Sequence, residues 1–215
     1  VPQNVAAVIV THSHRDHAAN ASTYSTRLGC PVRAAEATMP SIRLRSAAQA
    51  ETFTVGRPFA VGGITVHSQS IPHDVPQVAL RFETKSRSVG LATDLGRVPK
   101  RLSGFLSGCG TLLLESNHDP DMLAEGPYPA MLKRRVAGAG GHLSNGQAGD
   151  LLAGLGQAPE RVVLMHLSET NNSPRLARSS AEAALGHQGT ELLIAHQRKP
   201  LELGPVREPQ MQLGL

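Results

Sequence analysis

Thr11-His12-Ser13-His14-Arg15-Asp16-His17 follows directly on the apolar run Val5-Ala6-Ala7-Val8-Ile9-Val10. A short apolar run that ends in a polar turn is typical of a buried strand. Side chains two residues apart in extended chain point the same way, so His12 and His14 face one side of the turn. Both imidazoles can then reach one metal ion, and this short stretch therefore predicts a metal site at the end of a strand.

Asp16 and His17 add two more ligand-type side chains to the same turn. Ala18-Ala19-Asn20-Ala21 indicates the beginning of a helix, and the change of direction swings both side chains toward a second ion. Three neutral imidazoles and a carboxylate suit zinc, manganese or iron better than calcium or magnesium. The alternative is a polar loop that merely contains several histidines. Four ligand-type residues at this spacing after a strand disfavour that alternative.

The pattern His12-x-His14-x-Asp16-His17 resembles the signature of the metallo-β-lactamase superfamily. The resemblance implies an α/β fold, the four-layered αβ/βα sandwich, with a one- or two-metal site along one edge. Relatives usually place two or more strands before this motif. We therefore expect a fold that lacks its usual N-terminal strands, and a single hydrolase domain over residues 1–215 that is N-terminally incomplete. The superfamily contains β-lactamases, glyoxalase II, lactonases and nucleases, so the motif does not identify the substrate.

The resemblance also implies further ligands, each placed after a predicted strand. His73 resembles the third histidine of the first ion, and Asp74 would hold the His73 ring through its other nitrogen. Asp94 resembles the aspartate whose two oxygens bridge the ions, and His166 would complete the second ion. We therefore expect two divalent ions, Zn²⁺ or Mn²⁺, bound by a set of seven residues: His12, His14, Asp16, His17, His73, Asp94 and His166.

Two further segments separate substrate classes, namely Leu114-Glu115-Ser116-Asn117-His118-Asp119 and Gly141-His142-Leu143-Ser144-Asn145. They resemble elements of tRNase Z in which a glutamate orients a non-ligand histidine beside the scissile phosphate. Together with His166-Leu167-Ser168-Glu169-Thr170-Asn171-Asn172, they resemble most closely the YycJ/WalJ-like exonuclease group. The resemblance implies catalytic roles for Asp16, Glu115 and His142 and substrate contacts from Ser144, Asn145 and Asn171. His118 either supports the site or has a structural role in its loop.

The predicted activity is that of a metal-dependent phosphodiester hydrolase, a DNA exonuclease in which two ions generate a hydroxide and His142 is the general acid. The segment between His17 and His73 has no room for the arm with which tRNase Z grips tRNA. The segment between Asp94 and His166 is likewise too short for the inserted domain of RNase J-type enzymes. Two alternatives stay open: a small-molecule hydrolase on the same site, such as a cyclic phosphodiesterase or lactonase, and a non-catalytic truncated fragment.

Composition agrees with one domain and an anionic substrate. The 215 residues are 40% hydrophobic, enough for one core. The net charge of +4 leans toward an anionic partner but fits an ordinary, mildly basic protein equally well. The resemblance implies that the partner is nucleic acid, with DNA favoured over RNA. No Trp and 3% aromatic residues leave few surfaces on which bases could stack, so contact would depend on the phosphate backbone. The basic residues available for it are Arg43, Arg45, Lys133, Arg134, Arg135, Arg175 and Arg178.

Cysteine usage and hydropathy predict where the protein is found. Cys30 and Cys109 are isolated in apolar surroundings, which favours reduced thiols and a cytoplasmic protein. The longest apolar runs are too short to span a membrane, and we predict neither a membrane nor a protein partner. The metal, DNA against RNA, the direction of digestion and the oligomeric state stay open at this point.

Strand and helix signals alternate along the chain. A helix is predicted over 16–29, ended by Gly29, and another over 36–50, interrupted by Pro40. Gly62-Gly63 indicates a hairpin. Strands are predicted at 30–34, 52–60, 64–71, 78–84, 89–93, 111–115, 162–165 and 191–195, with an extended segment at 200–203. Further helices are predicted at 98–106, 120–137, 145–155 and 174–185.

Overall fold

The computed structural model describes residues 4–44, 49–186 and 189–204, and its strands form two sheets. The small sheet is parallel, in the order β1 (Val8–Val10), β2 (Val32–Ala35), β3 (Ala50–Phe53). The large sheet has the order β10-β9-β8-β7-β6-β5-β4. Its strands are β4 (Phe59–Val61), β5 (Ile64–Ile71), β6 (Gln77–Glu83), β7 (Ser88–Ala92), β8 (Thr111–Glu115), β9 (Arg161–Met165) and β10 (Glu191–Ile194). Strands β7 to β10 run parallel, whereas β4 to β7 pair antiparallel.

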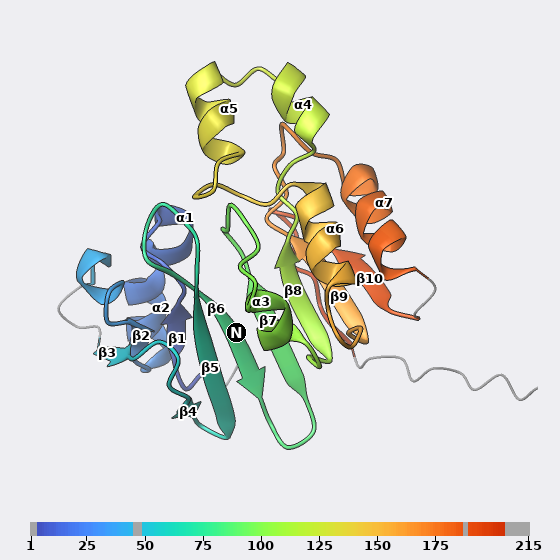
Figure 1. Cartoon of the computed structure of the whole chain (residues 1–215). Helices are drawn as coiled ribbons and strands as arrows, with labels where there is room; N and C mark the ends of the chain where they lie inside the picture. Colours follow the sequence, from blue (N-terminus) through green and yellow to red (C-terminus); the bar gives the residue numbers. More distant parts are fainter. Residues whose placement is uncertain (1–3, 45–48, 187–188, 205–215) are drawn as a thin grey trace, which may run out of the picture.

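Helices cover the outer faces of both sheets (Figure 1). Helix α2 (Ala21–Leu28) lies on the small sheet, while α3 (Leu102–Leu106), α6 (Asn145–Ala153) and α7 (Pro174–Leu185) lie on the large one. The remaining helical segments are short: α1 (Arg15–Ala18), η1 (Met39–Ser41), α4 (Pro120–Glu125) and α5 (Ala130–Val136). Among the described residues, no helix is both long and apolar enough to cross a membrane.

The molecule has four layers, namely helix, small sheet, large sheet and helices, and three apolar clusters fill the spaces between them. Val10 and Val32 pack with Ala21 between α2 and the small sheet. Phe53 of the small sheet packs with Leu80 of the large sheet in the space between the two. The third cluster joins the large sheet to α3, α6 and α7, and includes Ala79 and Ala92, Leu112 and Leu114, Leu151 and Ala177. Alternation along β6 places Ala79 and Leu80 in different clusters, as expected for extended chain. The expected αβ/βα sandwich is therefore confirmed.

Several predicted elements differ in extent from those in the structure. The helix predicted over 16–29 is divided at Ala19-Asn20 into α1 and α2, and Gly29 ends it in the left-handed conformation, with φ 65°. The helix predicted over 36–50 is wrong where residues are described, since only the single turn η1 forms around Pro40 before β3 begins. Residues 45–48 lie outside the described part.

Two other long predicted elements are each divided into two shorter ones in the structure. The strand predicted over 52–60 splits into the end of β3 and β4, which belong to different sheets. The Gly62-Gly63 hairpin is confirmed between β4 and β5. The helix predicted over 120–137 is interrupted between α4 and α5 by Gly126-Pro127-Tyr128-Pro129. The predicted extended segment 200–203 forms no strand.

Candidate metal centre

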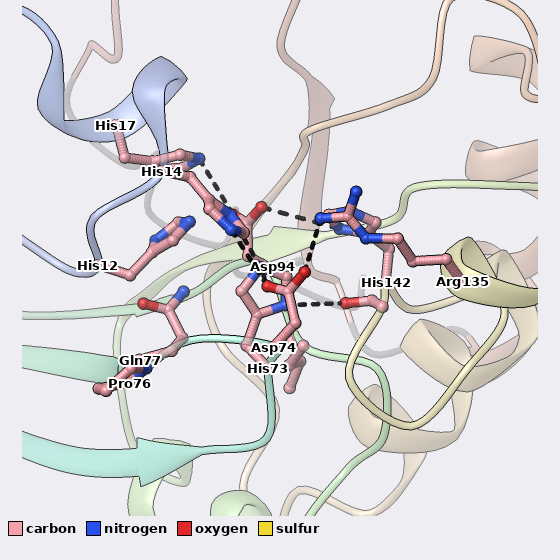
Figure 2. Close-up of polar contacts among 12 residues, drawn as sticks. His12, His14, His17, His73, Asp74, Pro76, Gln77, Asp94, Arg135 and His142 are labelled. Atoms are coloured by element: carbon pink, nitrogen blue, oxygen red, sulfur yellow. Dashed lines mark hydrogen bonds and ion pairs between the residues drawn. The ribbon is translucent and has the colours of Figure 1, made fainter. Parts of the chain in front are cut away.

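The predicted site residues come from loops that follow strands of both sheets. His12 and His14 follow β1, His73 follows β5, and Asp94 and His166 follow β7 and β9. Strands β7, β8 and β9 are parallel, and β5 runs in the same direction because it is antiparallel to β6, which is antiparallel to β7. Their carboxyl ends therefore meet at one edge of the large sheet. Figure 2 shows the loop after β1 approaching the same place from the other sheet.

The first group consists of the three histidines that the motif and its resemblance predicted. Nitrogen atoms of His12, His14 and His73 all lie within 4.8 Å of one another. His14 Nδ1 and His73 Nε2 are only 3.2 Å apart. The outer nitrogen of His73, Nδ1, donates to the carbonyl of Gly141 at 3.2 Å, so Nε2 is the nitrogen that faces the group. Three imidazoles converging in this way form a ready-made cation site.

His12 provides a test of whether a metal fits. Its ring is fully buried, and its Nδ1 lies 3.1 Å from the Thr11 hydroxyl. Its Nε2 is buried and has no hydrogen-bond partner among the described residues. Burial, and then the neighbouring His17, lower the pKa of His12 to about 4, so the ring is neutral at ordinary pH. A buried, neutral and unpaired imidazole nitrogen beside two others is what a metal ligand requires.

The second group joins Asp16, His17, Asp94 and His166, again with ligand atoms within 4.8 Å of one another. Asp94 Oδ2 lies 3.2 Å from His17 Nε2, and Asp94 Oδ1 lies 3.7 Å from His166 Nε2. Asp94 and His166 are the non-glycine residues with positive φ in the described chain, at 56° and 58°. Aspartate and histidine tolerate this conformation better than most residues, and such backbone strain concentrates at functional sites. The turn after each strand thus aims its side chain at the group.

Charge in the second group favours a cation. Burial alone would lower the pKa of His166, but Asp16, Glu115 and Asp94 together raise it to about 10. The hydrogen bond from His166 is the main reason that the pKa of Asp16 falls to about 2. Burial opposes ionisation of Asp94, yet its contacts with His17 and His166 hold the pKa well below the ordinary value. A negative field that binds a proton this firmly also attracts a divalent ion.

Glu115 links His142 to the second group of candidate ligands through hydrogen bonds. Its carboxylate is fully buried, and Oε1 accepts from His142 Nδ1 at 2.7 Å and from His166 Nδ1 at 2.9 Å. Oε2 accepts from the backbone amides of Leu95 and Leu143 at 3.0 and 3.2 Å. Both carboxylate oxygens of Glu115 therefore accept two hydrogen bonds each. Glu115 contacts His142 and His166 through Nδ1, so the Nε2 atom of each ring is not bound to Glu115. The predicted pairing of Glu115 with His142 is present, and the contact with His166 is one that the sequence prediction lacked.

The loop before His142 docks on the loop that holds His73. A Cβ atom on Gly141 would collide with the backbone carbonyls of Arg135 and Val136, so only glycine fits there. The Gly141 carbonyl in turn accepts from His73. A cavity of about 270 Å³ opens between these loops. It is lined by His14, Asp16, His73, Asp74, Asp94, Leu132, Arg135, Val136, Gly140, Gly141, His142 and His166. His142 is thus next to the candidate ligands and lines the same space.

Asp74 differs from its predicted arrangement. The prediction placed it on the outer nitrogen of His73, but that nitrogen binds the Gly141 carbonyl instead. Asp74 still contacts His73, with Oδ1 3.3 Å from Nε2, and the same oxygen lies 3.1 Å from His14 Nε2. Asp74 Oδ2 accepts from Arg135 at 2.6 Å (Figure 2). The reason is the close approach of the Gly140-Gly141 loop, which brings a carbonyl to the His73 ring first. Asp74 therefore orients His14 and ties α5 to the site.

Ser144, Asn145 and Asn171 are all buried. Ser144 caps α6 in a capping box with Gln147, and Asn145 bonds to Ser116 and Asn172. The side chain of Asn171 is buried at 1% exposure, away from the cavity lining. Their predicted contact with substrate stays a prediction, and this burial argues against it. His118 is also buried and its carbonyl accepts from the Asn145 amide, so the structural alternative fits it better.

Three supporting residues were missed by the sequence reasoning. Thr11 contacts His12, and the Thr93 hydroxyl donates to Asp94 Oδ2 at 2.7 Å. Each threonine directly precedes a predicted ligand at the end of a strand, which is a signal that could have been noticed. The Asn117 amide donates to the carbonyl of His166 at 2.9 Å and so supports its positive φ. Nothing local in the sequence announces that last contact, because it joins segments 49 residues apart.

Comparison with known proteins places this site in a family. The family described as "Beta-lactamase superfamily domain" matches residues 1–167. The chain is 32% identical to Exodeoxyribonuclease YycJ of Bacillus anthracis, over 86% of this chain and 73% of that protein. It is 31% identical to Exodeoxyribonuclease WalJ of Streptococcus pneumoniae, over 86% and 74%. Among solved structures, the metallo-β-lactamase fold protein YhfI of Bacillus subtilis matches with a TM-score of 0.70 at 20% identity, over 91% of this chain and 77% of that one.

The chain therefore belongs to the metallo-β-lactamase superfamily and, within it, to the YycJ/WalJ-like group. Family and site together make it a metal-dependent hydrolase, and the convergent His and Asp groups indicate that it binds divalent metal. Both the resemblance and the enzyme class predicted from the sequence are confirmed.

Proposed function

We propose that this chain is a metal-dependent phosphodiesterase that degrades nucleic acid, with DNA exonuclease activity as its function. The observation that carries the proposal is the Glu115–His142 pair, since neither residue is needed to complete the two sets of predicted ligands. The names of the two relatives, both exodeoxyribonucleases, support the same substrate class. Acid catalysis beside a metal centre is what the expulsion of an alkoxide from a phosphodiester demands.

The proposed centre holds two divalent ions, Zn²⁺ or Mn²⁺. His12, His14 and His73 would hold one ion, and Asp16, His17 and His166 the other, with Asp94 shared between them. When bound, such a pair supplies an activated water and positive charge that polarises a phosphoryl oxygen. The ring of His17, whose Nε2 lies 3.2 Å from Asp94 Oδ2, is 4.2 Å from the His12 ring between centroids, which supports a carboxylate close to both sets.

His142 is the proposed general acid. Glu115 holds its Nδ1–H at 2.7 Å and thereby fixes the ring, while Nε2 is left to carry a proton toward the leaving oxygen. Burial opposes ionisation of Glu115, but its hydrogen bonds with His142 and His166 hold the pKa of this carboxylate below its ordinary value. Donation of that proton as the bond from phosphorus to the leaving oxygen breaks is typically worth about 10²–10⁴-fold in rate.

Two of the three adjacent basic side chains on α5 already have hydrogen-bond partners in the protein. Of the run Lys133-Arg134-Arg135, the first donates to the Ala124 carbonyl and the third to Asp74. A substrate phosphate near Arg135 would therefore share the guanidinium with Asp74, which still leaves its other N–H groups available. Because such contacts are made to the phosphate backbone of the nucleic acid, we expect the affinity for DNA to fall as the salt concentration rises.

A comparison of substrates separates this proposal from the small-molecule alternative. We expect metal-loaded protein to degrade oligonucleotides with a kcat/KM well above that for bis-p-nitrophenyl phosphate, and to leave β-lactams and simple lactones intact. The physical reason is that a strand offers several phosphates for binding, whereas the small diester offers one. Efficient lactone or cyclic diester hydrolysis without any turnover of oligonucleotides would favour the alternative.

A further inference from the structure

A second cavity lies beside the metal-motif turn and shares no lining residue with the one at the candidate metal groups. It has a volume of about 390 Å³, within the range of small-ligand sites. Its lining residues come from the turn and α1 and from the segment around η1: Ser13, Arg15, Ala18, Ala19, Ser41 and Arg43. It thus joins two segments that the sequence separates, and every polar side chain in it can donate a hydrogen bond.

Two arginines line this cavity, and neither is paired with a carboxylate in the part of the chain that the structure describes. Arg15 and Arg43 are exposed, and within the described residues neither has a side-chain hydrogen bond or an ion pair. Arg33 and Arg81, by contrast, are paired with Glu51 and Glu83. Two guanidiniums at one cavity repel each other unless an anion lies between them. Arginine is also the side chain whose geometry best matches the oxygens of a phosphate group.

The cavity adjoins the predicted catalytic residues along the chain. Arg15 stands between His14 and Asp16, so its α-carbon is about 3.8 Å from each of theirs. His14 and Asp16 line the first cavity and Arg15 lines the second. Adjacent residues of one turn therefore line the two cavities. The lining holds no aromatic ring, which suits a phosphate and gives no surface for a base to stack on.

We propose that Ser13, Arg15, Ser41 and Arg43 form a binding subsite for a phosphate of the nucleic acid strand other than the one that is cleaved. The proposal rests on the proposed nuclease function and adds a second anchor point to it. Because the subsite contacts phosphate alone, it gives affinity without base preference. It also fixes the strand relative to the metals, which favours substrates of more than one nucleotide.

The test measures binding separately from cleavage. Dissociation constants of a fluorescein-labelled single-stranded DNA with phosphorothioate linkages, which resist cleavage, are determined by anisotropy across a range of salt concentrations. The metal-loaded wild type is compared with Arg43→Ala, Arg15→Gln and the double variant. Arg57→Ala is the matched control, because Arg57 is exposed in the turn between β3 and β4 and lines neither cavity. Metal content and Tm of each variant show whether the fold and the centre are intact.

We expect each single variant to reduce the slope of log Kd against log salt by about 0.7, the value for one lost single-strand phosphate contact, and the double variant by about twice that. Arg57→Ala should leave the slope unchanged. Slopes of Arg43→Ala equal to that of the control would overturn the subsite, even if Arg15→Gln fails to fold. Wild-type protein that does not bind the strand would overturn it as well. Binding with the expected slopes but no digestion of any nucleic acid would instead support the subsite and refute the nuclease function.

Discussion

Replacing Asp94 by alanine should abolish hydrolysis of every substrate and lower the metal content from two equivalents per chain to one or fewer. Asp94 is 1% exposed and contacts both His17 and His166. Loss of a residue that merely orients a ligand costs about 10–100-fold in metal affinity or activity, so loss of a shared ligand should exceed that range. The measurements are elemental analysis of carefully loaded protein and kcat on oligonucleotides.

Asp94→Asn is the control for shape. Asparagine also tolerates positive φ, so it retains the turn while it removes the charge that a second cation needs. It should keep the fold and still lose most activity. Near-normal turnover by Asp94→Ala would show that the bridge is assigned to the wrong residue. Wild-type protein that never holds more than one equivalent, under any loading condition, would contradict the binuclear centre.

His142→Ala should lower kcat for DNA by about 10²-fold or more while both metals stay bound, as expected for the loss of a general acid. A good leaving group needs less protonation, so the defect should be smaller for bis-p-nitrophenyl phosphate than for DNA. Neither of the two proposed ligand sets includes His142, whose Nδ1 lies 2.7 Å from Glu115, so both ions should stay bound without it. Rates on both substrates and metal content are measured together.

His14→Ala is the matched comparison, because His14 lines the same cavity but belongs to the first ligand group. It should lose metal and activity together on every substrate. If His142→Ala also lost a metal equivalent, His142 would be a ligand, as its closeness to Asp94, Glu115 and His166 allows. If it impaired both substrates by the same factor, it would have a structural role and not that of an acid.

The part of the site that could be predicted is the part written locally in the sequence. His12 and His14 stand two residues apart at the end of a strand, and extended geometry alone brings them together. His73, Asp94 and His166 each follow an apolar strand, and parallel strands bring such ends to one edge. For these residues, local pattern and global fold agree, which is why the resemblance also named them.

The rest depended on contacts between distant segments. Asp74 contacts His73 as its adjacency suggested, but at Nε2, because the Gly141 carbonyl, 68 residues away, occupies the outer nitrogen. Ser144 looked available to substrate, but helix α6 uses it as a cap. Pro40 limited a predicted helix to one turn, and the two sheets divided what looked like one strand. Tertiary packing decides the Asp74 contact and the divided strand, whereas Pro40 and the capping pattern of Ser144 with Gln147 are local signals that could have been read.

The central claim is that the two histidine and aspartate groups form a metal centre that cleaves nucleic acid phosphodiesters. The most direct measurement is digestion of end-labelled single- and double-stranded DNA and RNA by protein stripped of metal and then reloaded with Zn²⁺ or Mn²⁺. The account predicts no digestion by stripped protein, and stepwise shortening of DNA from one end once the metal is restored. Digestion that persists without metal, or reloaded protein that cleaves none of the four substrates, would contradict it.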